Sequence, residues 1–145
     1  MPFRFASVFA LILAAAGSAR AGVTPLRYVT GATAMANGTV VLDVRPESVC
    51  EKRSPANARC LPAGDFLGPH ERLAGFANIA WVLGSAGLTG AESVLVVGDD
   101  PRKRDFVAGI LYLMGQAHVS VLAQSLKTMG SSFGPGRPRA MSREA

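Results

Sequence analysis

Two adjacent carboxylates, Asp99 and Asp100, are the side chains of this sequence best placed to do chemistry, because they directly follow an apolar run. Paired carboxylates can act as acid and base or hold a metal ion. Neighbours on one loop rarely converge on one atom, however, and Pro101 after Asp100 is typical of a capped helix start. We therefore expect helix capping, with the basic residues 102–104 as a solvated first turn, and no catalytic role.

The two histidines, His70 and His118, do not complete a site with these carboxylates. His70 falls near the start of a predicted helix and His118 opens a predicted strand, so both are expected at the surface. Neither lies close in sequence to a cysteine, and the cysteine spacing is not a zinc pattern. The sequence predicts no metal site and no cofactor.

The two cysteines, Cys50 and Cys60, stand ten positions apart in a segment that contains proline. In an exported protein such a pair usually forms a disulfide, which would restrict the unfolded chain by about 2–3 kcal/mol. The alternative is a thiol site in which Cys60 is the nucleophile and Cys50 its resolving partner. That site needs an exposed thiol of low pKa, and its cationic neighbours would be Lys52, Arg53 and Arg59.

Export is predicted from the first 21 residues. Arg4 precedes an apolar run over 5–16 and a small-residue segment ending at Ala21, which is the order of a secretory signal. The run is shorter than the ~20 residues that span a bilayer, so cleavage is favoured over a retained membrane anchor. We expect a periplasmic or secreted protein of about 124 residues, one domain by length, without stable membrane insertion.

Charge and composition exclude some functions. The formal net charge is +5, of which Arg4 and Arg20 lie in the signal, leaving +3. Nucleic-acid binding would require a dense basic face, so it is not expected. Residues 130–145 mix glycine, proline, serine and arginine without periodicity and are predicted to be a flexible basic tail after a domain over 22–129.

Apolar patterning predicts the elements. β-Branched and apolar runs predict parallel strands near 39–44, 92–98 and 118–122, the second at the centre of a sheet buried on both faces. Helical spacing predicts one helix after Gly68-Pro69, ended by Gly84 and Gly87, and another from Pro101 to Met114. Irregular structure is expected over 47–67, and the core face of the first helix is expected to be Phe76, Ile79 and Leu83. Alternation of strands and helices predicts an α/β domain, with a parallel central sheet flanked by helices.

Four short motifs resemble those of a rhodanese domain, the sulfurtransferase fold. Residues 41–45 resemble its opening strand with a D-x-R signature, and 58–62 loosely resemble G-A-x-x-L-P. Residues 83–87 resemble L-x-x-x-G before the central strand, and 115–122 resemble G-H-x-x-V-x-V-L. The resemblance covers Tyr28 to Met129. It implies that Asp43 and Arg45 brace the loops at the carboxyl edge of the sheet by charge-assisted hydrogen bonds.

The resemblance also implies where sulfur chemistry would occur, in a C-R-x-G-x-R loop after the central strand. A cysteine thiolate there carries an anionic persulfide that is held by loop amides and a helix N-terminus. The corresponding residues here contain no cysteine, and an aspartate at the helix N-terminus would repel a bound anion by roughly 1 kcal/mol or more. We interpret the segment as a vestigial active-site loop, formed by Gly98, Asp99, Asp100, Pro101, Arg102, Lys103 and Arg104.

The resulting functional prediction is an exported, catalytically inactive rhodanese-like domain that binds a partner protein or a small anionic ligand. One alternative is a thiosulfate or persulfide sulfurtransferase, or a thiol-redox protein, that uses Cys50 and Cys60. Another is an accessory subunit of an exported complex whose tail, Trp81 or Phe133 supplies contacts.

Overall fold

The computed structural model describes residues 25–31, 35, 38–129 and 133–140. The signal predicted over 1–21 lies outside these residues. The elements, in chain order, are β1 (Arg27–Val29), β2 (Thr39–Asp43), α1 (Glu47–Lys52), β3 (Ser54–Pro55), β4 (Arg59–Cys60), η2 (Ala63–Phe66), η3 (Pro69–Glu71), α2 (Phe76–Ser85), β5 (Ser93–Val97), α3 (Pro101–Leu113), β6 (His118–Leu122), η4 (Leu126–Thr128) and β7 (Phe133–Gly134). Among the described residues, no helix is long and apolar enough to cross a membrane.

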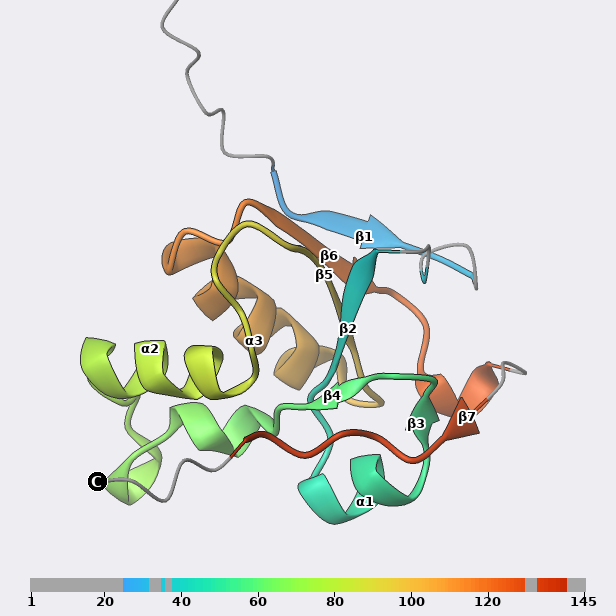
Figure 1. Ribbon diagram of the computed structural model, residues 1–145, viewed down its shortest axis with the longest axis horizontal. Helices are drawn as coiled ribbons and strands as arrows, with labels where there is room; N and C mark the ends of the chain where they lie inside the picture. Colours follow the sequence, from blue (N-terminus) through green and yellow to red (C-terminus); the bar gives the residue numbers. More distant parts are fainter. Residues whose placement is uncertain (1–24, 32–34, 36–37, 130–132, 141–145) are drawn as a thin grey trace, which may run out of the picture.

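The main sheet has five strands in the order β1-β6-β5-β2-β4, and every neighbouring pair is parallel (Figure 1). The predicted α/β architecture, with a parallel sheet flanked by helices, is therefore confirmed. A second, two-stranded sheet pairs β3 with β7 in antiparallel orientation.

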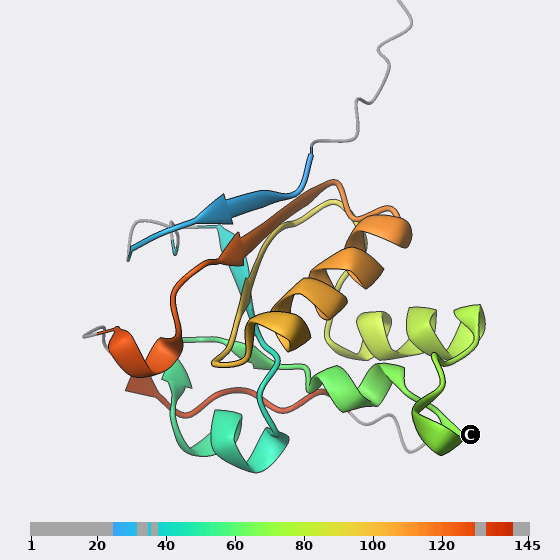
Figure 2. The same cartoon turned by 180° about the vertical axis from the view of Figure 1, so that it is seen from behind.

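The central strand, β5, is buried on both faces, as its continuous apolar sequence predicts. Val94 and Val96 belong to a core that α2, α3 and η2 cover, and Leu95 and Val97 point to the opposite face. That second face is closed by Leu126 of η4 and by neighbouring side chains rather than by a long helix. Figure 2 shows α2 and α3 together on one side of the sheet.

Two local expectations were wrong. Irregular structure was expected after Pro46, but α1 forms there, with the Pro46 carbonyl accepting hydrogen bonds from the Val49 and Cys50 amides at 2.9 and 3.0 Å. A helix of six residues is too short to show an apolar period. Phe76 was expected to face the core, yet it is 74% exposed, because α2 begins at this residue and its first turn is the helix end farthest from the sheet (Figure 1).

The other core predictions for α2 are confirmed, since Ile79 and Leu83 are buried. His70 is exposed but precedes α2 instead of lying in it. It belongs to the short turn η3 and has a positive φ of 59°, which interrupts any continuous helix from Pro69.

Residues 133–140 differ from the flexible tail expected over 130–145. They include β7, and the Arg137 amide donates to the Ala58 carbonyl at 2.8 Å while the Cys60 amide donates to the Arg137 carbonyl at 2.8 Å. The edge of β4 is thereby paired with this segment, which we call the C-terminal strap. The glycines and prolines of this segment allow an extended backbone that packs closely against the domain. Because the same composition is typical of disordered tails, it does not distinguish between the two.

Candidate functional site at the carboxyl edge of the sheet

The carboxyl ends of β2 and β5 bring two loops together. The Val44 amide donates to the Val97 carbonyl at 3.0 Å, so the loop after β2 follows the loop after β5. A Cβ on Gly98 would lie 2.9 Å from Cγ2 of Val44 and 3.8 Å from Cγ of Arg45. Glycine at position 98 therefore allows the two loops to approach this closely.

Asp43 and Arg45 form a brace at this edge of the sheet, which ties the end of β2 to Arg53 and Ser54. Oδ2 of the fully buried Asp43 accepts from Nη2 of Arg45 at 2.6 Å and from the Ser54 hydroxyl at 2.7 Å. Arg45 also donates its amide to Oδ1 of Asp43 at 3.0 Å and its Nη2 to the Arg53 carbonyl at 2.5 Å. These hydrogen bonds to the Asp43 carboxylate raise the pKa of Arg45 above its ordinary value.

The two adjacent aspartates point to different partners. Asp100 is the N-cap of α3, and its Oδ1 accepts from the Arg102 amide at 2.9 Å. Asp99 turns toward η4, where its Oδ1 accepts from the Ser125 hydroxyl at 2.7 Å and from the Lys127 amide at 3.2 Å. The predicted capping role therefore falls on Asp100 alone, and the two carboxylates do not converge on one ligand.

Arg104 corrects the expectation of a solvated first turn. It is only 4% exposed, and its guanidinium donates to the carbonyls of Gly98 at 2.7 Å, Gln124 at 2.9 Å and Ala123 at 3.2 Å. Its Nε is buried without a hydrogen-bond partner. Arg104 thus ties the loop after β5 to the loop after β6.

A sequence signal for this buried arginine existed. Val107, Ala108 and Leu111 are all buried and follow Arg104 by three, four and seven positions, which is one face of a helix. Charge alone suggested exposure, but the arginine occupies a core position of the α3 stripe.

A cavity of about 320 Å³ is lined by residues of the loops after β2 and β5 together with residues of α1, α3 and η4. Lys103 and Lys127 are exposed at its wall, and within the described part of the chain neither forms an ion pair with a carboxylate. The nearest charged pair across it joins Nη1 of Arg45 to Oδ2 of Asp99 at 3.7 Å. The lining combines apolar and charged side chains and comprises Val44, Arg45, Pro46, Val49, Asp99, Asp100, Lys103 and Lys127.

A second cavity, of about 580 Å³, adjoins the first and shares Asp100 and Lys103 with it. Arg102 and Phe106 of α3 form one side, and η2 and η3 contribute the other. The start of α3 therefore separates two hollows at the same edge of the sheet.

The predicted disulfide between Cys50 and Cys60 is present and joins α1 to β4. Both cysteines are fully buried, and the described residues include no free thiol. Two cations proposed to activate Cys60 are engaged elsewhere: Nη1 of Arg59 donates to the Ala86 carbonyl at 2.7 Å, and Arg53 lies 4.7 Å from the centroid of the Phe133 ring.

The histidines take no part in this site. His70 lies in η3, and His118 begins β6, at the amino edge of the sheet and thus opposite to the loops described above. Within the described residues, no group of three or more histidine, cysteine, aspartate or glutamate side chains could hold a metal ion.

No protein-family model and no curated protein matches this chain. Among solved structures, it is similar to the Alr3790 protein from Anabaena sp., with 20% sequence identity, a TM-score of 0.53 and coverage of 69% of this chain and 70% of that one. It is also similar to a rhodanese with anions from E. coli, with 18% identity, a TM-score of 0.48 and coverage of 68% of this chain and 99% of that one. At 20% identity, the similarity to Alr3790 shows a shared fold alone.

Proposed function

We propose that this protein is a rhodanese-like domain that binds an anionic ligand at the carboxyl edge of its sheet and performs no sulfur transfer. Its five parallel strands and the four sequence motifs support the assignment to the fold. The main support for the absence of sulfur transfer is the state of the two cysteines, which are joined in a buried disulfide. The loop after the central strand contains two aspartates and no cysteine.

Two amides at this edge of the sheet, one at the start of α3 and one in η4, already have carboxylate acceptors from the protein. The Arg102 amide at the start of α3 donates to Asp100, and the Lys127 amide donates to Asp99. An inorganic anion seated on these amides would have to displace a fixed carboxylate and would be repelled by it. Binding is therefore assigned to the side-chain cavity beside the loop.

That cavity suits an acidic group attached to an apolar one. The ammonium groups of Lys103 and Lys127 supply positive charge, whereas Asp99 is engaged by protein donors. Val44, Pro46 and Val49 contribute apolar surface to the same lining. We propose a carboxylate-bearing ligand, either a small organic anion or an acidic segment of a partner protein.

The alternative of a thiol enzyme that uses Cys50 and Cys60 receives less support. A nucleophilic thiol must be ionised and accessible, whereas Cys60 is fully buried and bonded to Cys50. Sulfur transfer through this pair would first require reduction and then exposure of a thiol.

The test of lost chemistry is a thiosulfate:cyanide sulfurtransferase assay on the purified protein, with and without prior reduction. We expect no turnover in either case, and no turnover in Asp99→Cys, because Asp100 still caps α3 beside the new thiol. Turnover that Cys60→Ser abolishes would support the thiol enzyme. Robust activity in Asp99→Cys would show that the anion site is still open.

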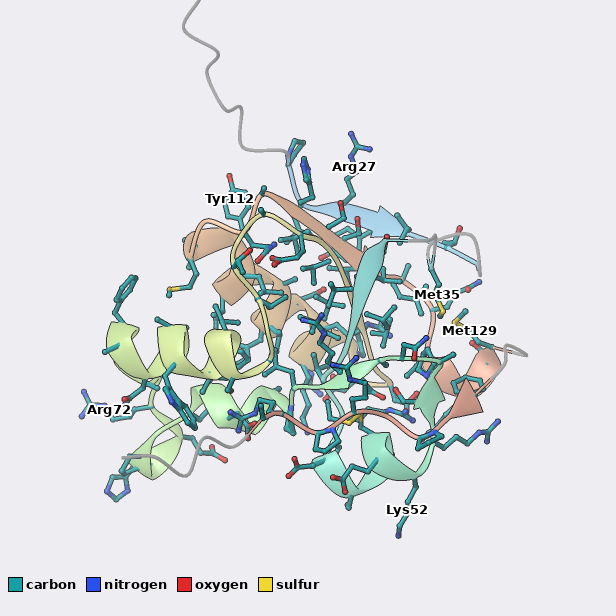
Figure 3. All side chains as sticks on the ribbon, in the orientation of Figure 1. Arg27, Met35, Lys52, Arg72, Tyr112 and Met129 are labelled. Carbon is teal, nitrogen blue, oxygen red and sulfur yellow. A yellow bond between two sulfur atoms is a disulfide. The ribbon has the colours of Figure 1, made fainter. Side chains whose placement is uncertain are left out.

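The test of binding uses citrate and an acidic peptide as separate probes in calorimetric titrations. We expect the double substitution Lys103→Ala and Lys127→Ala to weaken whichever probe binds by about tenfold or more, since two charge pairs are lost. Lys52→Ala is the matched control, because Lys52 lies on α1 outside the cavity lining and points away from the body of the protein (Figure 3). Equal weakening by Lys52→Ala would contradict a localised site, and absence of binding by both probes would contradict the proposed ligand class.

We also propose that the protein is exported, on the strength of the signal-like residues 1–21. Cell fractionation and the mass of the purified protein test this. A mature chain that begins at Gly22 is expected, and a cytoplasmic chain that retains Met1 would contradict it.

A further inference from the structure

The C-terminal strap lies directly on the Cys50–Cys60 disulfide. Gly136 is buried, and its amide donates to the Cys50 carbonyl at 3.0 Å. A Cβ at this position would lie 2.5 Å from the sulfur of Cys50 and 2.7 Å from that of Cys60. The strap therefore passes so close to the bonded sulfurs that only glycine fits.

Both ends of the strap are held by contacts of a different kind. Before Gly136, β7 pairs with β3, and Phe133 stacks under the guanidinium of Arg53. After it, Nη2 of Arg139 lies 2.7 Å from Oδ2 of Asp65, and its guanidinium lies 5.7 Å from the centroid of the Trp81 ring. In both views of the ribbon, this segment runs between β4 and α1 (Figures 1 and 2).

The closed position of the strap and the bonded form of the disulfide depend on each other. Because both sulfurs are fully buried, a reductant cannot reach them until the strap opens. Once the bond is broken, two thiols that are no longer bonded need more room than the disulfide does, and Gly136 leaves none on its side. Breaking the bond also loosens α1 from β4, which are the two elements that the strap contacts through Cys50 and Cys60.

We propose that the Cys50–Cys60 disulfide is a redox-controlled latch for the C-terminal strap. The bonded form holds residues 133–140 along β4, and reduction releases them. The freed edge then presents the Cys60 amide and the Ala58 carbonyl, which pair with Arg137 in the closed form.

The reductant is a dithiol. One of its thiolates attacks a sulfur of the pair, breaks the protein disulfide and forms a mixed disulfide, and its second thiol then displaces the remaining cysteine. Two electrons and two protons pass from the dithiol to Cys50 and Cys60, and the dithiol leaves as a disulfide. No other co-reactant is needed.

The test measures backbone order by ¹⁵N relaxation in the full protein, before and after reduction with dithiothreitol, with two titratable thiols as proof of reduction. We expect the order parameters of Gly136, Arg137 and Ala140 to fall from about 0.85 to below about 0.6, while those of β5 and α3 stay unchanged. A strap that keeps its order in the fully reduced protein would overturn the proposal. Equal loss of order in β5 and α3 would also overturn it, because the disulfide would then stabilise the whole domain.

A matched pair of strap variants tests the steric part without reduction. Gly136→Ala places a methyl group against both sulfurs, whereas Gly134→Ala meets no atom within 4 Å. In the oxidised protein we expect only Gly136→Ala to free the strap, and we expect dithiothreitol to reduce it at least about tenfold faster than Gly134→Ala. Equal order parameters and equal reduction rates in the two variants would overturn the proposal.

Discussion

The brace between Asp43 and Arg45 supports a quantitative prediction for Asp43→Asn. Asp43 is fully buried and accepts hydrogen bonds from the amide, Nε and Nη2 of Arg45 and from the Ser54 hydroxyl. The substitution keeps the shape of the side chain but removes its charge and turns one acceptor into a donor. Breaking a buried pair by removing one partner costs about 3–5 kcal/mol.

The lower end of that range applies here. The Arg45 side chain is 12% exposed and keeps its hydrogen bond to the Arg53 carbonyl, so part of its charge stays solvated or paired. We expect Asp43→Asn to lower the free energy of unfolding by about 3 kcal/mol. That is a large share of the roughly 5–15 kcal/mol that stabilises a typical domain.

Urea unfolding at pH 7 under non-reducing conditions measures this loss, with an unchanged m-value as evidence that the same transition is observed. The double variant Asp43→Asn and Arg45→Met should lose less than the two single variants together, with a coupling of about 1–3 kcal/mol. Asp65→Asn is the matched control, because Asp65 is partly exposed in its pair with Arg139 and should cost no more than about 1 kcal/mol. A loss below about 1 kcal/mol for Asp43→Asn, or additive losses in the cycle, would refute the reasoning.

Two further predictions concern stability. Arg104→Met removes three charged hydrogen bonds to carbonyls together with a buried charge. Urea unfolding should therefore show that the free energy of unfolding falls by about 2–4 kcal/mol. A fall of less than about 0.5 kcal/mol would contradict the role of Arg104 in joining the loops after β5 and β6. Glu92 has a pKa lowered from 4.5 to about 2, chiefly because the Thr89 hydroxyl donates to its carboxylate. A pKa lowered by folding stabilises the protein above about pH 4.5, and this contribution disappears as the pH falls toward 2. Thr89→Val should raise the pKa of Glu92, which an NMR titration would measure. It should also weaken the dependence of the free energy of unfolding on pH in the acidic range, which urea unfolding between about pH 2 and 6 would measure. An unchanged pKa of Glu92 would contradict the assigned role of the Thr89 hydroxyl.

The main elements could be predicted because their signals are local. The apolar run over 93–97 is long enough to require burial on both faces, and β5 does lie at the centre of the sheet. Asp100 followed by Pro101 predicts the start of α3, and the structure shows the cap. Two cysteines ten positions apart predict a disulfide that needs only loop closure, and the pair is bonded.

Other features depend on what lies across space. Phe76 has the spacing of a core residue, but it lies at the outer end of α2, where there is no sheet to cover it. Arg104 carries a charge yet is buried, since carbonyls of two loops that are distant in sequence converge on it. No local sequence pattern shows which backbone carbonyls will lie near Arg104 and accept its hydrogen bonds.

The sequence by itself determined the α/β class, the order of the main strands and helices along the chain, and the absence of a cysteine from residues 98–104, because each depends on residue type and short-range spacing. It favoured a disulfide between Cys50 and Cys60 over a thiol site, and the structure decided between them. Only the tertiary structure decided that Asp99 and Asp100 separate, that Arg104 enters the interior and that the strap covers the disulfide. These outcomes depend on backbone groups that meet only after the sheet has formed. The physical reason is that a hydrogen bond or a close contact is specified by both of its partners, and a partner can lie far away in the sequence, as Ser125 does from Asp99, at a separation of 26 positions.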